Sequence, residues 1–349
     1  ETACSDHRAR GMFKFYGANR TGRWSGWGIQ LQNLPQNHIK ELDIARRFVK
    51  QGNAKAMQIF FENPIDVLSQ LIRTAFVAVE GSRFIVADFS AIEARVLAWL
   101  ADEEWRMKVF ANGGDIYCAS ASAMFGVPVE KHGVNHELRA KGKVAELACG
   151  YGGGAGALKA MGADKMGLSD ADMQAIIDKW RKANPKISNF WSIMENCAKY
   201  AVRNRTIKHC RKGISFECVG EYLFVHLPSG RKISYVKPRI ILENDKENLA
   251  YQGTIQATGG WGRNFTWGGK LVENIVQATA RDCLAEAMIK LDRAGYKIVM
   301  HVHDEIISEM KNGEGSLQEV ISIMSEPISW ANGLFLTADG YETDYYRKD

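Results

Sequence analysis

Three polar residues stand in the middle of an otherwise apolar stretch, IVMHVHDEIISE at residues 298–309. Apolar and polar residues alternate up to His303, and apolar residues resume at Ile306, which predicts a β-hairpin with His303, Asp304 and Glu305 at its tip. Asn-Gly or Asp-Gly would turn more easily at such a tip. Two interpretations remain open: the acidic residues are ordinary turn formers, or they are ligands of a hard cation such as Mg²⁺.

His301 and His303 are expected to share one face of the first hairpin strand, as a zinc-binding pair would. No third His or Cys stands nearby at ligand spacing. We therefore interpret His301 as polar strand surface.

Asp88 lies at the end of a second apolar run, FIVADF at 84–89, which predicts another strand. Ser90 and Glu93 have the spacing of a capping box, so these residues could simply begin a helix. A carboxylate at the end of a strand is also well placed to bind a metal ion, although one Asp needs a partner. If the strands of Asp88 and Asp304 are neighbours, their carboxylates meet in a site suited to Mg²⁺.

Arg139, Lys143, Leu147 and Tyr151 recur at every fourth position and predict one face of a helix. Two cations one turn apart near a helix N-terminus would bind phosphates, and the alternative is a solvated charged face. Gly142 in mid-helix costs about 1 kcal/mol relative to Ala, which indicates close approach by another group. Tyr151, which precedes three glycines, is expected to be exposed and able to stack on a base.

The elements that would position these residues predict an α+β fold, because strands and helices mix without regular alternation. Helices are expected over 38–62, 65–76, 90–114, 271–294 and 316–331, with further helices up to about residue 200. Residues 205–256 are expected to form short strands, and 253–270 a Gly-rich loop with several Trp and Arg residues.

Composition narrows the class of protein. The 349 residues include 45 Lys and Arg and 40 Asp and Glu, and the net charge of +5 permits a polyanionic partner without requiring one. Seven scattered cysteines without a C-x-x-C pair favour reduced thiols in a cytosol-like compartment, and they argue against a zinc ribbon or a disulfide framework. No run of 18 apolar residues suggests a membrane span.

Together these stretches resemble the motifs of the family A DNA polymerases, the bacterial DNA polymerase I family. The matching segments, in chain order, are Thr21-Gly22-Arg23 with Leu31-Gln32-Asn33-Leu34-Pro35, motif A at 88–95, motif B from Arg139 to Gly152, Gln277 on the helix before motif C, and motif C at 303–305. The resemblance implies a right-hand polymerase fold with an antiparallel-sheet palm, residues 1–105 and 271–349. Mainly helical fingers, residues 106–270, would be inserted with a β-rich insertion near 205–256. The thumb would be largely missing, with its base near residues 1–20.

The resemblance also implies an activity, that of a DNA-directed DNA polymerase that adds dNTPs to a primer 3′-OH by two-metal nucleotidyl transfer. Asp88, Asp304 and the backbone carbonyl of Phe89 would hold two Mg²⁺ ions, for which Mn²⁺ could substitute. Glu305 would support this site. Lys143 would bind the triphosphate and could protonate the leaving pyrophosphate.

The remaining roles follow from the same resemblance. Arg139 would also bind the triphosphate, Leu147 and Tyr151 would line the nucleotide site, and Glu93 would exclude a ribose 2′-OH. The residues implied in DNA binding are Arg23, Gln32, Asn33, Tyr151, Gln277 and His303. The partners would be primer-template DNA and dNTPs, with an upstream thumb or exonuclease region or a separate processivity factor. The place of action would be the cytoplasm of a bacterial or phage-infected cell.

The chain departs from the family pattern in four places. Leu147 stands where most relatives have Phe or Tyr, and Tyr117 where many have His. About 120 residues separate Tyr151 from the Gln277 helix, more than the family usually needs. This excess includes the loop at 253–270, which either contacts DNA or is a plain surface loop. The short stretch before Thr21 has room for only the base of a thumb, so a phage-type polymerase fragment is expected.

Two alternatives belong to other classes of protein. One is a catalytically weak or inactive primer-template-binding fragment of such a polymerase. The other is a single-subunit RNA polymerase relative, against which Glu93 argues because such an enzyme must admit the 2′-OH.

Overall fold

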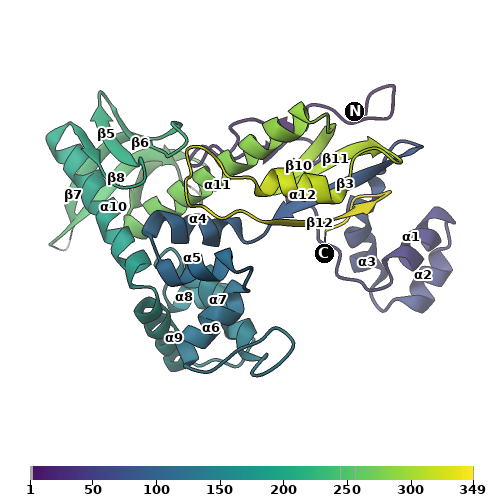
Figure 1. The fold of residues 1–349 in the computed structure, drawn as a ribbon, viewed down its shortest axis with the longest axis horizontal. Coiled ribbons are helices and arrows are strands. Elements are labelled where there is room, and N and C mark those ends of the chain that lie inside the picture. The colour runs from purple at the N-terminus through teal and green to yellow at the C-terminus, as the bar shows by residue number, and fades with distance from the viewer. Residues whose placement is uncertain (1–2, 244, 256, 349) are drawn as a thin grey trace. The chain divides into compact units, whose positions relative to one another are not determined.

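The computed structural model describes residues 3–243, 245–255 and 257–348, and the chain divides into two compact units (Figure 1). Unit 1 comprises residues 1–90, 284–326 and 337–349, and unit 2 comprises residues 91–283 and 327–336. Each unit contains helices and an antiparallel sheet, which confirms the predicted α+β class. None of the helices in the described ranges has the length and hydropathy that a membrane span requires.

A four-stranded antiparallel sheet forms the centre of unit 1, with the strand order β10-β11-β3-β12. Its strands are β3 (Ser82–Phe89), β10 (Ile298–Val302), β11 (Glu305–Lys311) and β12 (Ala338–Thr343). The central part of β3, from Phe84 to Ala87, is apolar and at most 3% exposed, so this part of the strand is buried on both faces. The strand and hairpin predictions are confirmed. Helix α12 (Leu317–Ser325), which packs on β3 and β12, ends before the predicted residue 331, since Pro327 follows.

The N-terminal part of unit 1 consists of short elements. They are β1 (Phe13–Lys14), β2 (Ser25–Gly26), η1 (Leu31–Asn33), α1 (Leu42–Lys50), α2 (Ala54–Phe60), α3 (Pro64–Leu71) and η2 (Ile72–Ala75). The helix predicted over 38–62 is therefore two helices. Gly52 between them has φ +63°, and the Asn53 side chain accepts the Ala56 N–H, which starts α2 as a new helix.

Unit 2 begins with a series of helices. They are α4 (Ile92–Ala101), α5 (Glu104–Ala111), α6 (Ile116–Phe125), α7 (Leu138–Cys149), α8 (Ala155–Ala160), α9 (Asp170–Ala183) and α10 (Pro185–Asn204). The single helix predicted over 90–114 is wrong. Asp102 has φ +53° and ends α4, and the buried Glu103 accepts the N–H groups of Lys186 and Ile187 at the start of α10 (2.9 and 3.2 Å).

A buried ion pair connects the helices of unit 2. The Arg106 guanidinium on α5 is fully buried and donates to both carboxylate oxygens of Glu146 on α7, with Nη1–Oε1 at 2.8 Å. Trp180 Nε1 donates to Glu146 Oε1 at 2.8 Å, and Arg106 Nη1 also donates to Asn184 Oδ1 at 3.1 Å. These partners offset much of the cost of burying the charge pair, although Arg106 Nε has no hydrogen-bond partner among the described residues.

A six-stranded antiparallel sheet follows in unit 2, with its strands in chain order from β4 to β9. They are β4 (Ile207–His209), β5 (Ser215–Val219), β6 (Tyr222–His226), β7 (Lys232–Glu243), β8 (Lys246–Thr254) and β9 (Trp261–Thr266). The predicted strand-rich segment is confirmed, but the loop predicted over 253–270 is wrong, since β9 pairs with β8 along its whole length. The glycines in this stretch obscured the alternation of Trp261, Arg263 and Phe265. Helix α11 (Gly268–Arg293) follows and agrees with the helix predicted at 271–294.

Candidate active site

Asp88 and Asp304 come to the same end of the central sheet of unit 1. Asp88 is the penultimate residue of β3, Asp304 immediately precedes β11, and Asp88 pairs with Glu305 in the strand register. The Phe89 N–H donates to the Asp304 carbonyl oxygen at 3.2 Å, which ties the hairpin tip to the end of β3. The two strands are thus neighbours, which meets the condition set for a shared carboxylate site.

The electrostatics of this site are those of crowded acidic groups. Burial and the nearby charge of Asp304 raise the pKa of Asp88 to about 8. Burial also raises the pKa of Glu305, whose carboxylate accepts the Tyr346 hydroxyl at 2.6 Å. The Lys348 ammonium lies 3.7 Å from Asp88 Oδ2 and 3.5 Å from Glu305 Oε2 and opposes both shifts. One ammonium thus offsets only part of the negative charge that three carboxylates would carry.

The oxygen atoms of the Asp88–Asp304 pair fit a magnesium ion. Asp88 Oδ1 is buried and receives no hydrogen bond from any residue in the described ranges, an arrangement that is costly unless a cation or solvent satisfies the oxygen. Mg²⁺ is usually held by one or two carboxylates, and water and substrate phosphates complete its coordination. Among the described residues, no three His, Cys, Asp or Glu side chains are placed to hold one metal ion together.

The turn between β10 and β11 consists of His303 and Asp304, while Glu305 is already part of β11 and is 3% exposed. His303 has φ +58°, a left-handed conformation that costs about 1–2 kcal/mol for a residue other than Gly. His303 is exposed, but desolvation by neighbouring groups and the Lys348 charge lower its pKa, and Arg23 and the Gln32 backbone lie near enough to influence it. The structure therefore brings Arg23, Gln32 and His303 together.

The two amides of η1 differ in their surroundings. Both amide atoms of Gln32 are buried and have no hydrogen-bond partner among the described residues. The Asn33 side chain is exposed and donates to Gln30 Oε1 at 2.9 Å.

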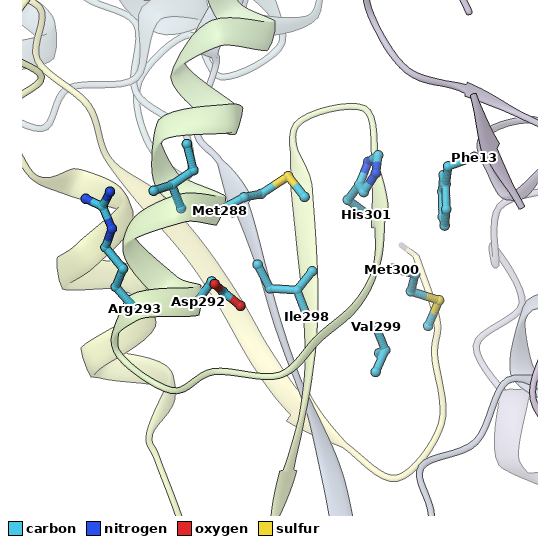
Figure 2. A pocket seen from close by; sticks show the side chains of 9 residues that line it. Phe13, Met288, Asp292, Arg293, Ile298, Val299, Met300 and His301 are labelled. Atoms are coloured by element: carbon cyan, nitrogen blue, oxygen red, sulfur yellow. The ribbon is translucent and has the colours of Figure 1, made fainter. Parts of the chain in front are cut away.

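The interpretation of His301 as strand surface is wrong, because this residue is only 6% exposed. Its ring stacks on Phe13 with the centroids 4.5 Å apart and meets the edge of Trp24 at 4.9 Å. Phe13 and His301 line a pocket of about 620 Å³ together with Met288 and Asp292. Figure 2 shows the Phe13 and His301 rings facing each other. His301 is thus a packing residue under an aromatic cover, and His303, which lies in the turn, does not share a strand face with it.

The capping box predicted for Ser90 and Glu93 is also wrong. Ala91, with φ +51°, precedes α4, and no side chain caps the helix. Glu93 instead accepts a hydrogen bond from the Tyr151 hydroxyl, with Oη–Oε2 at 2.7 Å. Tyr151 is consequently half-buried, not exposed as predicted.

Helix α7 in unit 2 carries Arg139, Lys143 and Leu147. Arg139 forms a salt bridge with Asp115, with Nη2–Oδ2 at 2.8 Å, and Asp115 also caps α6. Lys143 is exposed and forms no salt bridge with any residue in the ranges given above. Leu147 is 49% exposed, so this face of α7 presents one unpaired ammonium and one apolar side chain.

Gly142 permits the close packing of α7 on α6. A Cβ atom at Gly142 would lie 2.2 Å from the carbonyl oxygen of Tyr117, far inside the contact distance. The predicted close approach is confirmed, and the approaching group is the backbone of α6.

Three residues of these two sites were not predicted from the sequence to have a role. Lys348 and Tyr346 lie at the far end of the chain from β3 and carry no motif, so no local signal could have found them. Asp115 follows two glycines and precedes an apolar run, which is the usual signal of a helix N-cap. Gln277 lies on α11 as predicted and is half-buried.

Comparison with known proteins gives a consistent result. The model of DNA polymerase family A matches residues 3–337. The DNA polymerase of Bacillus phage SP02 is 54% identical over 348 residues, which is 99% of this chain and 54% of the phage protein. The thermostable DNA polymerase I of Thermus aquaticus is 28% identical over 246 residues, 69% of this chain and 24% of that protein.

Among solved structures, the POL domain of Pol1 from M. smegmatis, in complex with DNA primer-template and dNTP, has a similar fold. Its TM-score is 0.62 at 22% identity, and the match covers 99% of this chain and 49% of that one. The chain thus spans about half the length of the phage relative and a quarter of the Thermus aquaticus enzyme. The match of the family model over nearly the whole chain shows that the chain belongs to the family A DNA polymerases.

Proposed function

We propose that this chain is a template-directed DNA polymerase core that adds dNTPs to a primer 3′-OH. The observation that carries the proposal is the meeting of Asp88 and Asp304 at neighbouring strand ends, in a chain that matches family A over residues 3–337. We propose residues 1–105 and 271–349 as the palm and residues 106–270 as the fingers. Its partners would be primer-template DNA and dNTPs, in a bacterial or phage-infected cell.

Asp88, Asp304 and the Phe89 carbonyl would hold two Mg²⁺ ions, or Mn²⁺ in their place. When bound, these ions would lower the pKa of the primer 3′-OH and neutralise charge on the α-phosphate and the leaving pyrophosphate. Glu305, fixed by Tyr346, would keep the Asp88 side of the sheet negative and so favour cation binding.

In unit 2, Arg139 and Lys143 would bind the triphosphate. Lys143 is free of salt bridges within the described ranges, so its ammonium is available to bind phosphate and to donate a proton to pyrophosphate. Arg139 is held by Asp115, and a phosphate would have to compete with that carboxylate for the guanidinium. Leu147 and Tyr151 would line the nucleotide site.

The residues proposed to contact DNA divide between the units. Arg23, Gln32, Asn33 and His303 belong to unit 1, and Tyr151 and Gln277 to unit 2. The side-chain amide of Gln32 is buried and has no hydrogen-bond partner among the described residues. A nucleic acid would supply the hydrogen bonds that this amide lacks.

Primer extension tests the proposal. With Mg²⁺, the chain is expected to add the dNTP that the template specifies to an annealed primer. If it binds primer-template but adds no nucleotide under any metal condition, the proposal fails and the alternative of an inactive binding fragment is supported.

Replacing Glu93 with Ala is expected to increase incorporation of rNTPs relative to dNTPs by about 10- to 100-fold. The Tyr151 hydroxyl holds the Glu93 carboxylate at 2.7 Å, and a side chain fixed in this way can exclude a 2′-OH at the scale of 1–3 kcal/mol. Single-nucleotide extension with matched rNTP and dNTP measures the ratio.

Tyr151→Phe serves as the companion variant, because it removes only the hydrogen bond that positions Glu93. It is expected to raise the same ratio by a smaller factor. An unchanged ratio in Glu93→Ala would discard the proposed role of this residue.

A further inference from the structure

The six-stranded sheet of unit 2 has one covered and one open face. The covered face packs against α10 and carries apolar residues such as Phe216 and Ile233, which are at most 1% exposed. On this side Asn274 of α11 also donates to the Tyr235 hydroxyl at 2.8 Å. Successive residues of a strand alternate between faces, so the other side chains of these strands form the open face.

Strand β9, at the edge of this sheet, places two aromatic rings and a cation on the open face. Trp261 and Phe265 are 66% and 48% exposed, and Arg263 between them is exposed as well. Being two and four residues apart, the three side chains point the same way, and the two rings stand on Cα atoms about 13 Å apart. Exposed apolar side chains that gather on one face, unlike those scattered singly, mark interaction sites.

A β-bulge brings a second cation to this face. Val236 of β7 pairs with Gln252 of β8, but Arg239 pairs with Ala250, so β7 has one extra residue between these positions. Ala250 in turn pairs with Phe265 and Gln252 with Arg263. Because paired residues share a face, the bulge directs Arg239 to the same side as Arg263 and Phe265.

The cations surround a small pocket of about 220 Å³, lined among others by Lys237, Arg239, Gln252 and Arg263. Arg239 and Arg263 form no salt bridge with any residue of the described ranges, and Lys237 meets Glu221 only at 3.7 Å. Ala250 also lines this pocket and is only 2% exposed, because the longer neighbouring side chains cover it.

Charge is concentrated in the segment that forms this sheet. Residues 205–266 contain ten Lys and Arg and five Asp and Glu, a net charge of +5 that equals the formal net charge of the whole chain. The segment is thus positive as a whole, and Lys237, Arg239 and Arg263 are the cations of it that line the pocket, where they complement a polyanion.

We propose that the open face of this sheet, defined by Trp261, Arg263, Phe265, Arg239 and Lys237, binds single-stranded DNA. Unpaired bases would stack on Trp261 and Phe265, and phosphates would contact Arg263, Arg239 and Lys237. Proteins that bind single-stranded DNA without sequence preference combine exposed aromatic rings, which stack on bases, with cations that contact the phosphates. Strand β9 has this combination. A duplex keeps its bases stacked on each other and cannot use the rings, so the single strand is the favoured form. The inference does not rest on the proposed catalytic residues, none of which lies on this sheet.

The test is binding of a fluorescein-labelled oligothymidine of about 12 nucleotides to the full chain, followed by anisotropy without metal or dNTP. The double variant Trp261→Ala/Phe265→Ala is expected to raise the Kd about 10-fold or more, since each stacked base contributes about 1–3 kcal/mol. Arg263→Ala is expected to reduce the slope of log Kd against log salt by about 0.7, the value for one phosphate contact on a single strand.

Lys246→Ala is the matched control, because Lys246 lies at the tip of the β7–β8 hairpin in the same sheet and loses the same charge. It is expected to leave both Kd and salt slope as in the unaltered chain. The proposal is overturned if the chain does not bind the oligonucleotide, if the variants and the control behave alike, or if a blunt duplex of equal length competes equally well. Because no nucleotide addition is measured, a failure of primer extension would leave this result intact, and the reverse also holds.

Discussion

Replacing Asp88 or Asp304 with Asn is expected to lower the rate of primer extension about 10³-fold or more. Each carboxylate belongs to the pair that fits Mg²⁺, and Asn keeps the size of the side chain while it removes the charge. Metal ions contribute several kcal/mol of transition-state stabilisation. A loss of about 4 kcal/mol corresponds to three orders of magnitude in rate. Single-turnover extension with saturating dNTP measures the effect.

Asp339→Asn provides a matched control for both variants. Asp339 lies on β12 directly opposite Asp88 in the register, but its side chain is exposed and accepts the Gly340 N–H. This variant is expected to extend primers at the rate of the unaltered chain. If Asp88→Asn and Asp304→Asn also keep that rate, the assignment of the pair is wrong.

Replacing Arg106 with Ala is expected to destabilise the chain by about 3–5 kcal/mol, because Glu146 is then left as a buried charge without its partner. Trp180 and Asn184 would lose or rearrange their hydrogen bonds to the same pair. Denaturant-induced unfolding, followed by tryptophan fluorescence, measures the change in the free energy of unfolding.

The control is Lys186→Ala, which removes a surface ion pair between Lys186 of α10 and Glu104 of α5. Both partners of that pair are largely exposed, so the unfolding midpoint is expected to change little. If Arg106→Ala and Lys186→Ala lower the free energy of unfolding equally, burial of the Arg106–Glu146 pair does not determine its contribution to stability.

Local sequence pattern was sufficient for part of the site. The apolar runs before Asp88 and around Asp304 predicted strands, and two carboxylates at strand ends suggested a shared metal site. The four-residue spacing of Arg139, Lys143 and Leu147 predicted one face of a helix, and Gly142 predicted its close packing. In these cases the prediction depends on residues that are near in sequence, or on the pairing of two strands that each have a clear apolar pattern.

The failures occurred where distant residues decide the outcome. Glu93 has the spacing of a capping residue, but the Tyr151 hydroxyl engages its carboxylate instead. His301 looked like strand surface because nothing near it in sequence covers it, whereas Phe13 and Trp24 do so in the fold. Lys348 reaches the acidic site from the segment after β12, a contact that no spacing rule could predict. These are tertiary contacts between segments far apart in sequence.

The central claim is that Asp88 and Asp304 hold the divalent cations. A measurement of Mn²⁺ binding tests it most directly. Free Mn²⁺ can be followed by electron paramagnetic resonance in a titration of the chain with a dideoxy-terminated primer-template and the matched dNTP. Relative to the unaltered chain, the double variant Asp88→Asn/Asp304→Asn is predicted to lose the tight Mn²⁺ sites, while Asp339→Asn keeps them. Retention of the same number of sites with the same affinity in the double variant would contradict the account.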